Sequence, residues 1–112
     1  MSISFHGIGQ VCATFLGSNI NEGHVVKMSA SGTVAACSDG DSFCGVAACC
    51  KDDACSVQVD GFATIGYSGT APAAGWNNLS ANGSGGVKVT ADGRSYLVVA
   101  VDTNAKTVTI KL

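Results

Sequence analysis

The chain has 112 residues and a formal net charge of −2, and only 12% of its residues are charged. This length suits one domain of ordinary size. The charge balance gives no electrostatic reason to expect binding to nucleic acid or to an anionic membrane, and no apolar stretch approaches the roughly 20 residues that a membrane span needs. A soluble domain typically has about 25% charged residues, so the low charge favours a surface that is covered by copies of the chain or by a partner.

Residues 1–20 are expected to form an N-terminal arm and a first strand. They have no basic n-region, and glycines interrupt them early, so they do not match a signal peptide. We expect the chain to stay in the cytoplasm after synthesis. Residues 2–10 contain Gly7 and Gly9 and predict either a disordered terminus or a flexible arm that reaches a neighbour. The alternation in residues 11–16 suits a strand that is buried on both faces or lies at an interface.

A stretch of the chain occurs twice. Residues 39–59 and 92–112 align without a gap, 53 positions apart. Each copy reads as a turn, an apolar run, a polar turn and an alternating strand, which predicts a β-hairpin that is used twice. The matched pairs include Asp39 and Asp92, Gly40 and Gly93, Ser42 and Ser95, Phe43 and Tyr96, Val46 and Val99, and Ala47 and Ala100.

The repeat predicts the fold class. A looser similarity between residues 23–32 and 75–83 extends the repeated unit to about residues 21–68 and 75–112 of a single β domain, residues 21–112. No helical period lasts longer than about a turn. We therefore predict an all-β protein, a small barrel or sandwich built from two duplicated hairpin units related by a pseudo-twofold axis and preceded by the N-terminal arm.

Two apolar features lie outside this alternation. Trp76 directly follows the linker between the halves, and we expect it to pack over an open end of the core. Residues 97–101 are apolar without alternation, which is typical of a strand buried on both faces. We expect one of those faces to meet a second subunit.

The cysteines are the most prominent candidates for chemistry. Zinc sites favour two cysteines in CxxC-like spacing, and this spacing does not occur. In the aligned repeat, Cys44 and Cys55 correspond to Leu97 and Val108, so we interpret the cysteines as small buried apolar residues, mostly reduced. A metal site and a disulfide between Cys50 and Cys55, which flank one turn, remain open alternatives. The six cysteines are Cys12, Cys37, Cys44, Cys49, Cys50 and Cys55.

The remaining polar residues predict no catalytic, cofactor-binding or metal site. His6 and His24 have no recognisable nucleophile and orienting group. The carboxylates fall mainly in turns, and the acidic residues 39–41 recur with an arginine in residues 92–94, against a calcium loop. Residues 82–86 lack the features of a phosphate loop and predict a hairpin loop. We expect no enzyme activity and no bound cofactor.

Three stretches carry a resemblance to a known family. Residues 23–34, 40–47 and 55–62, with an echo of the second in residues 93–100, resemble small capsid cement or decoration proteins of tailed bacteriophages and prophages. The resemblance covers residues 20–112. It implies a structural protein that is made in the bacterial host cytoplasm and sits on the capsid surface of the virion. Its implied partners are copies of itself, often as trimers, and a major capsid protein.

The physical pattern adds two expectations to this resemblance. Residues 2–16 are expected to dock on a partner by adding a strand to its sheet edge, and residues 97–101 are expected to contribute to a subunit interface. Other functions stay open. They are a phage tail or head–tail accessory component, a small barrel whose ligand pocket is lined by Tyr67, Trp76 and Tyr96, and a cysteine–metal module.

Overall fold

A computed structural model describes residues 9–112 of the chain, so the expectations for residues 2–8, including His6, lie outside the described residues. Ten strands form, and within this described range there is no helix. The predicted all-β class is confirmed. The strands are β1 (Val11–Leu16), β2 (Val25–Ala30), β3 (Thr33–Ala36), β4 (Gly45–Lys51), β5 (Ala54–Asp60), β6 (Phe62–Gly66), β7 (Gly75–Ala81), β8 (Val87–Val89), β9 (Arg94–Asp102) and β10 (Thr107–Lys111).

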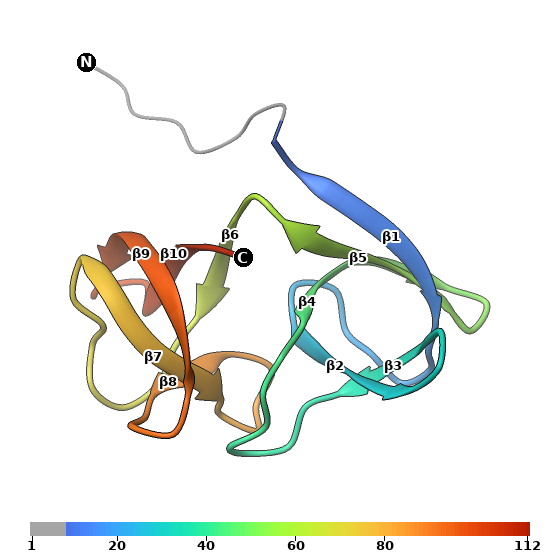
Figure 1. The fold of residues 1–112 in the computed structure, drawn as a ribbon, viewed down its shortest axis with the longest axis horizontal. Coiled ribbons are helices and arrows are strands. Elements are labelled where there is room, and N and C mark those ends of the chain that lie inside the picture. The colour runs from blue at the N-terminus through green and yellow to red at the C-terminus, as the bar shows by residue number, and fades with distance from the viewer. Residues whose placement is uncertain (1–8) are drawn as a thin grey trace.

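The strands form two lobes that lie side by side along the long axis of the molecule (Figure 1). The first lobe is a closed barrel in the order β1-β3-β2-β4-β5. The second lobe is a five-stranded sheet in the order β6-β10-β9-β7-β8. A single parallel pair, Leu16 with Thr33, joins β1 to β3, and an isolated parallel bridge between Tyr67 and Val87 lies in the matching place of the second lobe.

The two lobes share one topology. The order β5-β4-β2-β3 in the first lobe matches β10-β9-β7-β8 in the second, and β1 lies beside β5 as β6 lies beside β10. The structural repeat therefore includes β1, which the sequence alignment placed outside it. In register, Ala13 faces Val57 and Ala63 faces Ile110. The sequence signal for this match is short, an Ala-Thr pair in each strand.

The length of one turn shifts the alignment of the repeat. Ala47 pairs with Val57 in the first lobe, and Val98 pairs with Ile110 in the second. Ala47 therefore corresponds to Val98, 51 positions later, whereas Val57 corresponds to Ile110, 53 positions later. The β4–β5 turn consists of residues 52 and 53, both at positive φ, as a two-residue hairpin turn of type I′ requires. The β9–β10 turn is two residues longer. The gapless alignment at 53 positions therefore matches β5 to β10 as the structure does. It places the residues of β4 two positions away from their structural counterparts in β9.

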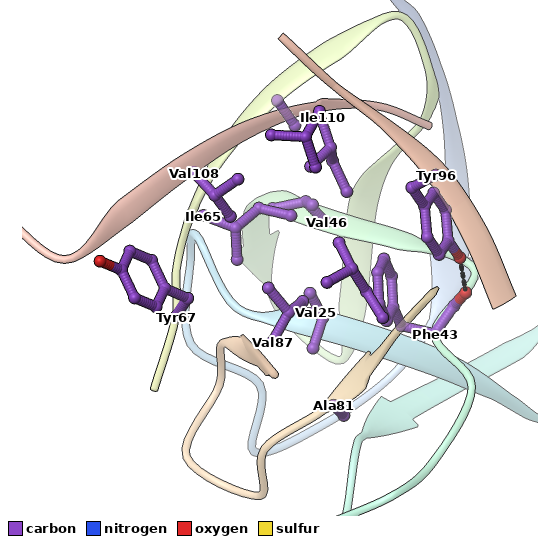
Figure 2. Close-up of a cluster of buried hydrophobic side chains, with 13 residues drawn as sticks. Val25, Phe43, Val46, Ile65, Tyr67, Ala81, Val87, Tyr96, Val108 and Ile110 are labelled. Carbon is purple, nitrogen blue, oxygen red and sulfur yellow. Dashed lines mark hydrogen bonds between the residues drawn. The ribbon is translucent and has the colours of Figure 1, made fainter. Parts of the chain in front are cut away.

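The hydrophobic cores of the lobes share a wall. Neighbouring residues of β2, Val25 and Val26, belong to different cores, and so do Val46 and Ala47 of β4. Because successive side chains of a strand point to opposite faces, these two strands supply both lobes. Figure 2 shows Val25, Val46 and Phe43 packed among side chains of the second lobe.

A polar and aromatic contact also joins the lobes. The Tyr96 hydroxyl donates to the Phe43 carbonyl oxygen at 3.1 Å, and the two rings stack with their centroids 4.8 Å apart (Figure 2). Beside them, the loop before β4 bonds to the end of β7, where the Ala81 N–H donates to the Asp41 carbonyl oxygen at 2.9 Å and the Gly40 N–H donates to the Ala81 carbonyl oxygen at 2.8 Å.

Three expectations are corrected. Trp76 does not cover the core: its side chain is 72% exposed, because Leu79 and Ala81 face inward and place it on the opposite side of β7. Residues 97–101 are not buried on both faces, since all except Val98 are only half-buried. β1 pairs with β5 of its own chain along its whole length, so Val11–Leu16 is a barrel strand and not a free docking arm.

Candidate functional site

Cys50 and Cys55 form a disulfide across the β4–β5 hairpin, with their Cα atoms 4.1 Å apart. The disulfide that the sequence left open is therefore present, and these two are not reduced thiols. Their counterparts in the second lobe, by pairing and bulge position, are Val101 and Val108, which face each other across β9 and β10. The bridge thus occupies the position of an apolar pair.

The other four cysteines are free thiols. Cys12 and Cys49 are exposed, and Cys37 and Cys44 are half-buried. Burial raises the pKa of the Cys37 thiol to about 11, and the nearby negative charge of Asp41 acts in the same direction. Burial also raises the pKa of the Cys44 thiol. Neither half-buried thiol is activated as a nucleophile, since the thiolate is the reactive form. Among residues 9–112, no three His, Cys, Asp or Glu side chains gather to hold a metal ion.

The predicted turn residues have structural partners. Asp41 accepts from Lys27 Nζ at 2.6 Å and from the Ser38 N–H at 2.8 Å. The hydrogen bond from Lys27 is the chief cause that lowers the pKa of Asp41. Asp39 forms an ion pair with Lys88 at 2.8 Å. These contacts connect the loop before β4 to β2 and to β8.

The glycine-rich segment joins β7 to β8, as the predicted hairpin loop does. Gly85 has a φ of +90°, and a Cβ there would meet the imidazole of His24. The Val25 N–H donates to the Gly85 carbonyl oxygen at 3.0 Å. This loop therefore packs against the first lobe, and His24 lies at the contact between the lobes.

The three aromatic residues of the predicted ligand pocket do not come together. Tyr67 and Tyr96 are buried in the second-lobe core and lie on different sides of it (Figure 2). Buried hydrophobic side chains line the interior of each lobe. Trp76 and Tyr96 instead line a shallow surface hollow of about 200 Å³, which we call the Trp76 hollow. Its lining residues are Trp76, Arg94, Ser95, Tyr96, Leu97, Lys111 and Leu112.

Neighbouring strands build the Trp76 hollow. In register, Trp76 faces Leu97 and Leu97 faces Lys111, so these three side chains lie in a row across β7, β9 and β10. The Arg94 guanidinium carbon lies 5.2 Å from the centroid of the Tyr96 ring, within the range of a cation–π contact. Burial raises the pKa of the Tyr96 hydroxyl, which the positive charge of Arg94 opposes.

Lys111 at the rim is only weakly engaged. Its Nζ donates to Asp60 Oδ1 and to the Leu112 carbonyl oxygen, each at 3.3 Å. Both charged side chains are about half exposed, and such surface pairs contribute little. Neither Arg94 nor Lys111 was predicted from the sequence as a binding residue. The sequence does contain a signal for the exposure of Trp76. Leu79 lies three positions after it in the same strand, so the two side chains point to opposite faces.

A second candidate surface is the seam between β1 and β3 in the first lobe. In the described part of the chain these strands pair only at Leu16 and Thr33. The Leu16 N–H donates to the Gly32 carbonyl oxygen on the β3 side. Because amide directions alternate along a strand, the Thr14 N–H points to the same side.

Large apolar side chains lie around this seam. Leu16 is 62% exposed and Met28 47%, whereas Val11, which is 50% exposed, lies at the far end of β1 opposite Asp60. Leu16 lies on β1, and Met28 pairs with Val34 of β3. A strand edge flanked by exposed apolar groups is a template for pairing with another chain.

Neither a protein-family model nor a curated protein matches this chain. Over the described residues, no helix is long and apolar enough to cross a membrane. The fold and its surfaces define a small two-lobed all-β protein with one sparsely paired strand seam and one aromatic hollow lined by Arg94 and Lys111.

Proposed function

We propose that this chain is a non-enzymatic structural protein that assembles with copies of itself, as a capsid decoration protein of a phage or prophage. The observation that supports it best is the β1–β3 seam, which one residue pair closes, with exposed Leu16 and Met28 near it. A strand edge with few backbone partners is a template for pairing with another chain, and symmetric assembly covers such an edge. The low fraction of charged residues, 12%, agrees with a surface that is covered in the assembled state.

Size-exclusion chromatography with light scattering tests the assembly. We expect the native chain to be an oligomer, a trimer by the family resemblance, at micromolar concentration. Thr14→Pro removes the backbone N–H that points into the seam and keeps the backbone groups of β1 that pair with β5. Because proline cannot donate a hydrogen bond to a neighbouring strand, we expect this variant to be monomeric. Thr14→Val keeps the N–H and is the matched control. A native monomer would contradict the proposal.

The attachment site is a separate question. For a decoration protein, we expect a major capsid gene beside the gene for this chain, and we expect the purified protein to sediment with undecorated heads. A phage tail or head–tail accessory component is the second candidate. Binding to tails and not to heads would favour it.

A further inference from the structure

We propose that the Trp76 hollow binds an acidic sugar ring, a pyranose that carries a carboxylate, as one unit of a saccharide chain. The hollow lies on the second lobe, and the seam lies on the first. The two proposals are therefore independent, and either can fail alone.

The aromatic platform is the first line of argument. Trp76 is 72% exposed, so one face of its indole is open to a ligand, and Leu97 beside it on β9 extends the apolar floor. A tryptophan ring carries negative charge density on its face. The C–H groups on one face of a pyranose are weakly positive and flat enough to stack on it, and this contact buries apolar surface on both partners.

The charge of the hollow is the second line. Arg94 and Lys111 line it, and no Asp or Glu side chain is among the described residues that line it, although Asp60 Oδ1 lies 3.3 Å from Lys111 Nζ at the rim. Asp60 offsets the charge of Lys111, so the attraction for a carboxylate rests on Arg94. The cation–π contact with Tyr96 positions Arg94. Its planar guanidinium has the geometry to bind a carboxylate through two hydrogen bonds.

The size of the hollow is the third line. Pockets that enclose drug-sized ligands measure about 300 to 1,000 Å³, whereas this hollow measures about 200 Å³. This volume has room for about one six-membered ring. Nucleic acid would need a row of cations along its backbone, and the six Lys and Arg residues of this chain are scattered.

Tryptophan fluorescence tests the proposal directly, because the chain contains one tryptophan. We expect trigalacturonate to change the emission of Trp76 in a saturable way, with a dissociation constant in the millimolar range. Neutral maltotriose should bind at least about tenfold more weakly, since it lacks the charge-assisted contact. Monomeric galacturonate distinguishes a free sugar from a chain. Equal affinity for galacturonate and trigalacturonate would show that the hollow binds one ring.

Variants locate the binding. Arg94→Gln should weaken trigalacturonate binding about fivefold, because it removes a charged hydrogen bond at an exposed site. Lys88→Gln removes an equal charge outside the hollow and should leave the affinity unchanged. Trp76→Ala, followed by calorimetry and checked for folding by circular dichroism, should abolish the heat of binding.

Several results would overturn the proposal. They are the absence of any fluorescence or calorimetric response at millimolar trigalacturonate, equal affinity for maltotriose, and unchanged affinity in Arg94→Gln. A shift of the Trp76 emission on dilution without sugar would show that a second copy of the chain covers the hollow. Tighter binding of dAMP than of trigalacturonate would assign the hollow to a nucleotide.

Discussion

At the scale of single residues, exposure separates the free cysteines into two pairs. Cys12 and Cys49 lie at the surface, whereas Cys37 and Cys44 are half-buried. The thiolate is the form that reacts with thiol reagents. A half-buried thiol is therefore protected both by its raised pKa and by the neighbouring side chains that limit access to it. The four thiols therefore differ in reactivity although none of them has an evident chemical task.

We predict that Cys37 reacts at least about tenfold more slowly with iodoacetamide at pH 8 than an exposed thiol of ordinary pKa, because its smaller thiolate fraction outweighs the greater nucleophilicity of a more basic thiolate. Its pKa is raised from 9.0 to about 11, which lowers the thiolate fraction at pH 8, and its rate should keep rising until the pH passes about 11. A time course followed by peptide mass spectrometry measures this. In urea the difference should disappear, and equal native rates for Cys37 and Cys49 would refute the prediction.

At the scale of elements, the β4–β5 and β9–β10 hairpins have different residue pairs at the same structural position. The first lobe uses the disulfide between Cys50 and Cys55, and the second uses Val101 opposite Val108. Cys55 is buried in the first-lobe core. Because the second lobe packs valines there, the position needs an apolar pair and not a specific sulfur chemistry.

We predict that Cys50→Val/Cys55→Val is more stable than Cys50→Ser/Cys55→Ser by about 2 kcal/mol, because a hydroxyl buried without a partner is penalised. Both double variants lack the bridge, so the comparison isolates packing from the loss of cross-linking. The bridge itself closes a short loop and is worth about 2 kcal/mol in the chain-entropy model. Urea unfolding measures all three proteins, and equal stability of the two double variants would contradict the packing argument.

At the scale of the whole molecule, local patterns predicted the architecture and missed what depends on distant contacts. Alternation and turn residues predicted the hairpins because strand and turn lie next to each other in sequence. The turn at residues 103–106 is two residues longer than the turn at residues 52–53. An alignment without a gap cannot represent this difference, so it misplaces the strand before the turn by two residues. The pairing of Leu16 with Thr33 and the gathering of Arg94 and Lys111 at Trp76 arise only when separate strands meet.

The shared wall of β2 and β4 makes both lobes one folding unit. Val25 and Val26 are adjacent, 1% and 0% exposed, and belong to the second-lobe and first-lobe cores respectively. We predict that Val25→Ala and Val26→Ala each lower the free energy of unfolding by about 2 kcal/mol and keep a single transition, because loss of either core removes the wall of the other. Hydrogen exchange of β5 and β10 amides measures the coupling. Loss of protection in β10 alone for Val25→Ala, with β5 unchanged, would show that the lobes unfold independently.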